Sequence, residues 1–228
     1  MDLQRRSMIT SDEIYRELCR KIENLDYMPG NAISENELCA QYDTSRHVVR
    51  GAISMLRQRR LLEVYPQRGS FVSLIDMDYV SDLVYMREAI EQEAVVRILE
   101  QGSGVDEVCE KMEACIHCQK AHQEETIAGE EFHSLDTKFH EYLLEAAGKK
   151  DIMKMMDESY IHFRRWRNLE LRSMITVKQV IDEHEEIVRA LKARDRQEAR
   201  RKIHTHIDKV DLFYSECKRT KNEYFYKR

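Results

Sequence analysis

The sequence predicts a mainly α-helical protein in two parts, an N-terminal winged helix-turn-helix over residues 1–75 and an all-helical bundle over residues 76–228. Two observations support this prediction. Between Ser34 and Val72, an acidic helix start, an arginine-rich helix and a short basic hairpin follow one another in the order of a winged helix-turn-helix. The rest of the chain has few helix breakers, because all 228 residues include only 7 glycines and 2 prolines.

The first part of this pattern predicts two short helices joined by a turn. Ser34 and Glu37 have the spacing of a capping box, so a helix is expected to begin there and to reach about Tyr42. After the turn, either Thr44 or Ser45 can cap the second helix. Two helices in this arrangement form the core of a DNA-binding helix-turn-helix.

The second helix should present two arginines to solvent. Apolar residues recur at helical spacing from Val49 to Leu56 and predict one buried face. Arg46 and Arg50 lie one turn apart, off that face and early in the helix, where a recognition helix meets the major groove. Arginine at such a position can bind a guanine edge or a phosphate.

A basic hairpin follows, with strands expected at Leu62–Tyr65 and Ser70–Leu74 and Arg68 in the turn between them. From residue 44 to residue 70 there are six arginines and one acidic residue, although the whole chain has a net charge of −5. Three of the six can equally be a solvated helix end whose cations offset the helix dipole: Arg57, Arg59 and Arg60. Positive charge is therefore confined to one surface, which favours DNA as the partner.

The remaining sequence is acidic and predicts a helical bundle that follows a short linker at residues 75–77. No apolar run is long enough for a membrane span and the N-terminus has no signal-peptide pattern, so we expect a cytoplasmic protein with no membrane partner. The six cysteines form no disulfide framework, and Cys115 and Cys118 are expected to be free thiols. The expected helices are 77–100, 105–126, 128–147, 150–171, 176–193 and 195–220.

Histidines in this bundle suggest a metal site. Asp136 and His140 are four residues apart and His133 lies three before Asp136, so all three share one helix face. His184 and His206 lie on the last two expected helices, which in an antiparallel bundle can meet the same interior point. One carboxylate and three imidazoles suit Zn²⁺ first, with Ni, Mn or Fe as alternatives. From spacing alone, ordinary surface or core histidines are the commoner explanation.

Residues 29–72 resemble the DNA-binding domain of GntR-family bacterial transcription regulators. The matching motifs are PG at 29–30, ENEL at 35–38, SRHVVRGA at 45–52 and RGSFV at 68–72. Val48, Gly51 and Arg60 depart from the family pattern, which often has proline, glutamate and glycine there. The residues expected at the DNA are Ser34, Asn36, Thr44, Ser45, Arg46, His47, Arg50, Gln67, Arg68 and Gly69.

From residue 76 to about residue 211 the chain resembles the FCD effector domain of the FadR branch of that family, through the motifs MREAIEQEAV, LDTKFHEYLLEAAGK, DEHEEIVRALKARD and ARRKIHTHIDKV. The resemblance implies a metal held by Asp136, His140, His184 and His206. Register favours His206 over His204 for the last ligand. Arg87 and His133 are expected at the effector, with an ion pair from Arg87 to Glu91 as the alternative.

Together these resemblances imply a transcription regulator, a repressor, that binds a pseudo-palindromic operator as a homodimer and responds to a small carboxylate coordinated to the metal. Two alternatives are a metal-independent regulator with a larger ligand, such as an acyl-CoA, and a metal-dependent hydrolase. His184 begins an HExxH-like run, but Val188 stands where the second histidine is required. An enzyme is therefore not expected.

Overall fold

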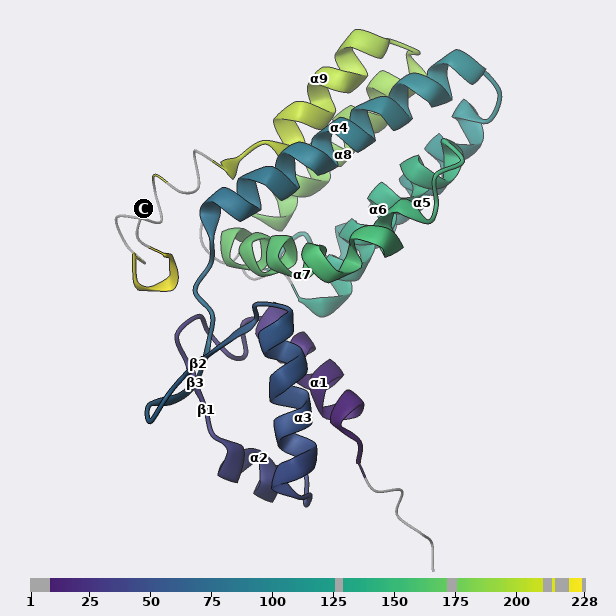
Figure 1. The fold of residues 1–228 in the computed structure, drawn as a ribbon. Coiled ribbons are helices and arrows are strands. Elements are labelled where there is room, and N and C mark those ends of the chain that lie inside the picture. Colours follow the sequence, from purple (N-terminus) through teal and green to yellow (C-terminus); the bar gives the residue numbers. More distant parts are fainter. Residues whose placement is uncertain (1–8, 126–128, 172–175, 211–214, 216–221, 227–228) are drawn as a thin grey trace, which may run out of the picture. The chain divides into compact units, whose positions relative to one another are not determined.

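The computed structural model describes residues 9–125, 129–171, 176–210, 215 and 222–226, and it is mainly helical, as predicted (Figure 1). The chain divides into two compact units, one formed by Met1–Ile75 with Lys221–Arg228 and the other by Asp76–Thr220. Within the described ranges, no helix combines the length and the apolar character that crossing a bilayer requires.

The first unit is a winged helix-turn-helix, as predicted. Its three strands form an antiparallel sheet in the order β1-β3-β2, and the β2–β3 hairpin is the wing. The second strand of the hairpin begins one residue earlier and ends two residues earlier than predicted. The elements are α1 (Ser11–Glu23), β1 (Ala32–Ile33), α2 (Glu35–Gln41), α3 (Arg46–Gln58), β2 (Leu62–Tyr65) and β3 (Gly69–Val72).

Serine side chains begin both helices of the helix-turn-helix. The Ser34 hydroxyl accepts from the backbone N–H of Glu37 at 3.3 Å. The Ser45 hydroxyl accepts from the N–H of Val48 at 3.5 Å, so Ser45 and not Thr44 is the N-cap of α3. The apolar face predicted for α3, from residue 49 to residue 56, is buried.

Gly51 marks the place where α1 packs against α3. A Cβ at this position would lie 2.4 Å from the Ser11 hydroxyl oxygen and 2.9 Å from its Cβ. That hydroxyl is held in place because it donates to the carbonyl of Val48 at 2.8 Å. Glycine therefore allows a close helix contact that the glutamate common in the family would not allow.

Arg60 ends α3 in a left-handed conformation, with φ of 56°. The N–H of Leu61 donates to the carbonyl of Leu56 at 2.9 Å, the hydrogen bond that defines a Schellman motif. Glycine is favoured at this position because it has no Cβ to clash in the left-handed region. The glycine typical of the family thus has a conformational reason, and this chain places an arginine there instead.

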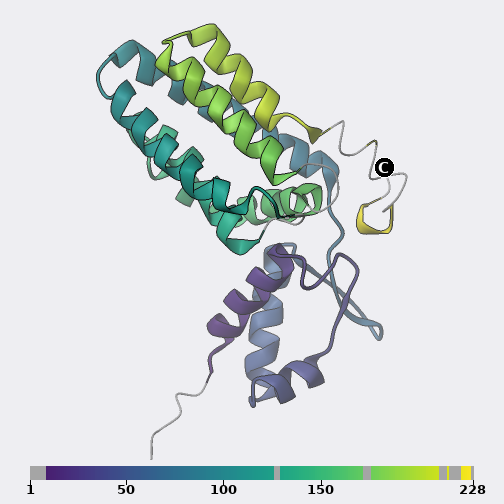
Figure 2. The ribbon, with the colours of Figure 1, turned by 180° about the vertical axis from the view of Figure 1, so that it is seen from behind.

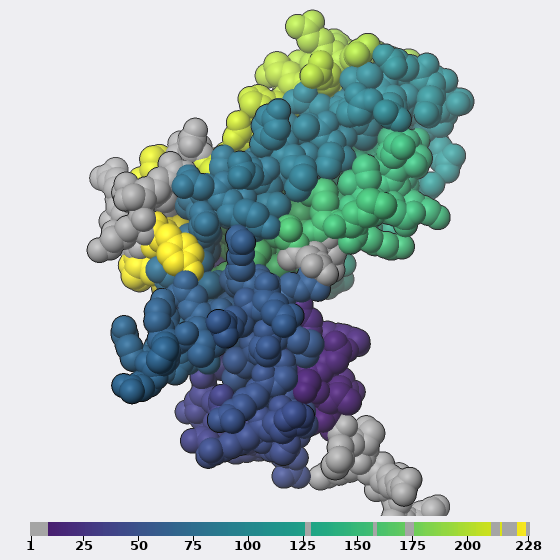
Figure 3. All heavy atoms as spheres, in the orientation of Figure 1, coloured from purple at the N-terminus to yellow at the C-terminus, as the bar shows by residue number. Residues whose placement is uncertain are grey.

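The far end of the chain belongs to the first unit. Ile75 donates to the carbonyl of Tyr224 at 2.8 Å and accepts from the N–H of Tyr226 at 3.2 Å, forming a parallel bridge to Phe225. Phe225 is only 2% exposed. The Tyr226 hydroxyl donates to the Glu63 carboxylate on β2. This segment, which includes the short helical turn η2 (Asn222–Tyr224), is yellow in Figure 3 and lies beside the blue of the first unit.

The second unit is a helical bundle. α4 packs against α6, α7 and α9, and α5 and α9 each pack against α8 (Figures 1 and 2). The last expected helix is interrupted, because α9 ends at Ile207 and residues 208–209 are not helical, and its expected end at residue 220 lies outside the described residues. The second expected helix ends early as an α-helix, at Gln119. The expected boundaries at 126, 128 and near 173 lie outside the described residues. The elements are α4 (Met77–Gln101), α5 (Val105–Gln119), η1 (Lys120–His122), α6 (Glu130–Ala146), α7 (Ile152–Leu171), α8 (Val177–Lys192) and α9 (Arg196–Ile207).

Candidate metal centre and DNA-binding surface

Four side chains from three helices meet inside the bundle. Asp136 and His140 come from α6, His184 from α8 and His206 from α9, and all four are buried. Each offers one ligand atom, and these atoms all lie within 4.8 Å of one another. These are the four residues that the sequence placed at a metal. His133 is half-buried and lies outside this group.

Each imidazole is oriented by an oxygen of a neighbouring helix. In each case ring Nδ1 lies 2.7–2.9 Å from a side-chain oxygen that can only accept from it. The proton is then on Nδ1, and the lone pair of Nε2 faces the centre of the group. The pairs are His140 with Glu91, His184 with Gln119, and His206 with Glu183.

The atoms facing the centre lack donors of their own. Nε2 of His206 and Nε2 of His140 are 3.2 Å apart, so two lone pairs point at each other. Nε2 of His184 lies 3.6 Å from Oδ1 of Asp136, and neither atom has a hydrogen-bond partner among the described residues. Buried acceptors in this arrangement repel one another unless a proton or a cation lies between them.

The ionisation states match those of metal ligands. Burial lowers the pKa of His184 and of His206 well below the usual value, and a neighbouring imidazole lowers each further. Burial alone would raise the pKa of Asp136, but the positive charges of Arg167 and Arg87 hold it far below its usual range. His184 and His206 are therefore neutral and Asp136 is ionised, which is the state in which these side chains bind metals.

Arg87 lies in the interior beside this group. It is 6% exposed, and its Nε donates to Glu91 at 2.7 Å, so the ion pair considered from the sequence is present. Its positive charge also acts on Asp136. Arg87 can thus hold Glu91 in place for His140 and still face a ligand at the metal group.

Sequence reasoning missed the oxygens that orient the rings. Glu183 immediately precedes His184 but serves His206, so its role could not be read from spacing within one helix. Gln119 and His184 are 65 residues apart, and no motif connects them. Of the arginines in residues 164–167, the structure buries Arg165 and Arg167, and Arg167 pairs with Glu170.

The helix-turn-helix arginines lie on an exposed face. Arg46 donates through Nη2 to Oδ1 of Asn36 at 2.9 Å, and Arg50 donates through Nε to Glu35 at 3.0 Å. Residues of α2 therefore orient both side chains of α3. The exposed residues among those expected at DNA are Asn36, Ser45, Arg46, His47, Arg50, Gln67, Arg68 and Gly69, whereas Ser34 and Thr44 are half-buried.

The wing tip is a tight turn that projects from the unit (Figures 1 and 3). The N–H of Arg68 donates to the carbonyl of Tyr65 at 3.1 Å, and Gln67 has a positive φ of 62°. The Arg68 guanidinium lies 5.6 Å from the centroid of the Tyr65 ring. The tip thus presents a positioned, solvent-exposed cation.

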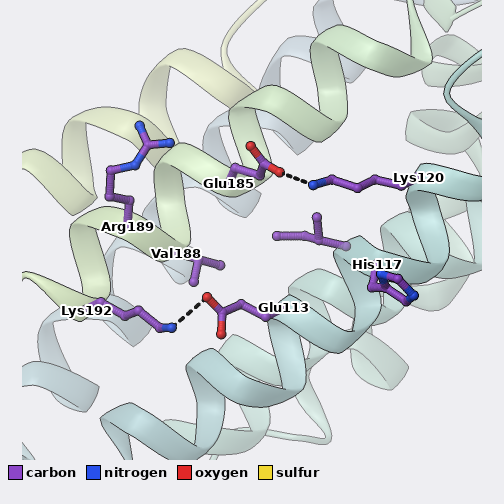
Figure 4. Close-up of a pocket in the computed structure, with 8 residues that line it drawn as sticks. Glu113, His117, Lys120, Glu185, Val188, Arg189 and Lys192 are labelled. Carbon is purple, nitrogen blue, oxygen red and sulfur yellow. Dashed lines mark hydrogen bonds and ion pairs between the residues drawn. The ribbon is translucent and has the colours of Figure 1, made fainter.

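An open groove of about 410 Å³ lies between α5 and α8 (Figure 4). Lys120 pairs with Glu185 near one end and Lys192 pairs with Glu113 near the other, both at 2.6 Å. These two ion pairs bridge the groove. Its lining includes none of the four residues of the candidate metal centre.

Two family models match the chain in sequence. Residues 10–72 match the model of bacterial regulatory proteins of the gntR family, and residues 82–209 match the FCD domain. A helix-turn-helix transcriptional regulator in an unstable DNA locus of Streptomyces ambofaciens is 30% identical over 87% of this chain and 82% of its own length. The transcriptional repressor RspR of Escherichia coli is 26% identical over 94% of this chain and 93% of its own length.

Solved structures share the fold. McbR/YncC of Escherichia coli has a TM-score of 0.67 and 16% identity over 92% of this chain and 99% of that one. A regulator from Rhodococcus has a TM-score of 0.63 and 20% identity over 90% of this chain and 97% of that one. Both matched families are regulatory and neither is enzymatic. The chain therefore belongs to the GntR family of bacterial transcription regulators, and its second unit is an FCD domain.

Proposed function

We propose that this DNA-binding regulator is a homodimeric repressor whose affinity for a pseudo-palindromic operator is set by a small carboxylate bound at a metal in the FCD domain. One observation carries the proposal. Three imidazoles with Nδ1 already engaged turn Nε2 toward one another and toward Asp136, down to 3.2 Å between His140 and His206. A divalent cation relieves that repulsion and satisfies the orphaned atoms.

The donor set fits a transition metal. Asp136, His140, His184 and His206 supply three nitrogens and one oxygen, the donors that Zn²⁺, Ni²⁺, Mn²⁺ or Fe²⁺ accept. When bound, such an ion offers positions to an anionic oxygen ligand. Arg87 supplies a guanidinium, which suits a carboxylate.

The DNA half of the proposal rests on the exposed basic face. Arg46 and Arg50 on α3 and Arg68 on the wing present donors for base edges and phosphates. Two relatives are named repressors, RspR of Escherichia coli and the gluconate operon repressor of Bacillus licheniformis, which supports the same role here. A coupling of about 1–3 kcal/mol between ligand and DNA would change operator affinity roughly 5- to 150-fold.

The test is metal content of the full chain purified without chelator, measured by elemental analysis. We expect close to one transition metal per chain, lost in His184→Ala and His206→Ala. His204→Ala is the matched control, because His204 is exposed, two residues away on the same helix, and outside the buried group. Metal-free wild-type protein, or metal retained in both variants, would refute the metal centre. A metal-free protein that binds an acyl-CoA would instead support the metal-independent alternative.

A further inference from the structure

A second buried arginine, Arg167 on α7, acts on the same interior point as Arg87. Tyr160, Phe163 and Arg167 lie three, four and seven residues apart and share one face of that helix. The guanidinium carbon of Arg87 lies 4.9 Å from the Phe163 ring centroid and 5.9 Å from the Tyr160 ring centroid. The charge of Arg167 acts on Asp136 and also on Arg87. This face of α7 is therefore directed at the candidate metal centre.

The hydrogen-bond donors around this face are not all paired. The Tyr160 side chain is 3% exposed, and its hydroxyl has no hydrogen-bond partner among the described residues. Arg87 bonds Glu91 through Nε, and Arg167 bonds Glu170 through one terminal nitrogen. A buried polar group left unpaired destabilises the protein. A ligand that brings acceptors to these donors would remove that destabilisation.

The charges at the same point favour an anionic ligand. Two buried guanidiniums, on α4 and α7, lie near it, each paired with one glutamate. A divalent ion would add two further positive charges there.

The geometry points to a ligand with two carboxylates, a short dicarboxylic acid. This inference rests on the metal centre proposed above and names the class of acid that it takes. One carboxylate would bind the metal ion and accept from Arg87. The other accepts from Arg167 and from the Tyr160 hydroxyl, a recognition that a monocarboxylate of equal length lacks. Arg167 and Tyr160 are then the residues that determine specificity.

The experiment compares matched acids on the zinc-loaded full chain by calorimetry and thermal shift. Malonate, succinate and glutarate are each measured against the monocarboxylate of equal carbon number: propionate, butyrate and valerate. We expect at least one diacid to bind about tenfold or more tightly than the monocarboxylate of equal carbon number, because its second carboxylate gains charge-assisted hydrogen bonds.

Two variants locate the second carboxylate. Tyr160→Phe removes only a hydroxyl and should lower the affinity for the diacid roughly three- to tenfold. The affinity for the monoacid and the zinc content should stay unchanged. Arg167→Gln combined with Glu170→Gln removes a buried ion pair as a unit, which spares the fold the cost of an unpaired charge, and should abolish the diacid preference.

The two proposals can fail separately. Absence of zinc in the wild type refutes the proposed metal centre itself. Zinc bound at full occupancy, with diacids and monoacids bound equally, or with no acid of the panel bound, overturns the dicarboxylate inference and leaves the metal centre standing. Unchanged diacid affinity in Tyr160→Phe together with the Arg167→Gln/Glu170→Gln variant also overturns it.

Discussion

Replacing Arg60 with glycine should stabilise the DNA-binding unit. Arg60 has φ of 56° at the end of α3, where an L-residue pays a left-handed penalty of roughly 1–2 kcal/mol. Glycine removes that penalty but adds freedom to the unfolded chain, worth roughly 0.4–1 kcal/mol. The balance is a gain of about 0.5–1 kcal/mol in the free energy of unfolding, or roughly 2–8 °C in melting temperature for a unit of this size.

Arg60→Ala is the matched control for this change. Like Arg60→Gly, it removes a positive charge that interacts favourably with the C-terminal end of the helix dipole. Unlike Arg60→Gly, it keeps a Cβ in the left-handed region. The free energy of unfolding of Arg60→Gly should therefore exceed that of Arg60→Ala by about 1 kcal/mol. If the two variants were equally stable, the backbone argument would be refuted and the side chain alone would matter.

The assay can separate the two units within the full chain. The single tryptophan, Trp166, is buried in α7 of the FCD domain, so its fluorescence follows the second unit. Circular dichroism follows helices in both. A shift in the dichroism transition without a shift in tryptophan fluorescence assigns the gain to the first unit.

The remaining predictions concern the same unit. Gly51→Ala should destabilise it by about 1–3 kcal/mol in urea unfolding because of the clash with Ser11, and adding Ser11→Gly should restore stability; a harmless Gly51→Ala would contradict the close helix contact. Glu35→Gln should raise affinity for operator and scrambled duplexes up to about fivefold in anisotropy titrations, since it releases Arg50 and removes a negative charge; weaker binding would mean that Glu35 positions Arg50 for readout. Arg68→Ala should lower the slope of log affinity against log salt by about one, whereas an unchanged slope would place the wing away from phosphate.

Local rules predicted most of the first unit. The Ser34 cap, the buried face of α3 and the wing strands all follow from spacings within a few residues. Helix α1 was missed, although Thr10 and Glu13 form a complete capping box that marks its start. The spacing rule that marks Ser34 as a helix start marks Thr10 in the same way.

Elements fixed by distant contacts were harder to predict. α9 was expected to reach residue 220, because apolar residues continue beyond Ile207 and periodicity alone gives no stop there. The four residues of the candidate metal centre could be predicted from motif register. Their orienting partners could not, because Glu91 reaches His140 across 49 positions and Gln119 reaches His184 across 65.

The bridge between Ile75 and Phe225 makes the FCD domain an insertion within the DNA-binding unit. The chain leaves that unit at Asp76 and returns to it only at Lys221. During synthesis, Phe225 and Tyr226 leave the ribosome only after the whole effector domain. The first 75 residues therefore lack the contacts of Phe225 with Ile75 and of Tyr226 with Glu63 until then. A fragment ending at Ile75 would expose that residue and lack its backbone bridge to Phe225. An isolated DNA-binding domain that keeps these contacts has to join residues 9–75 to residues 222–226 through a linker.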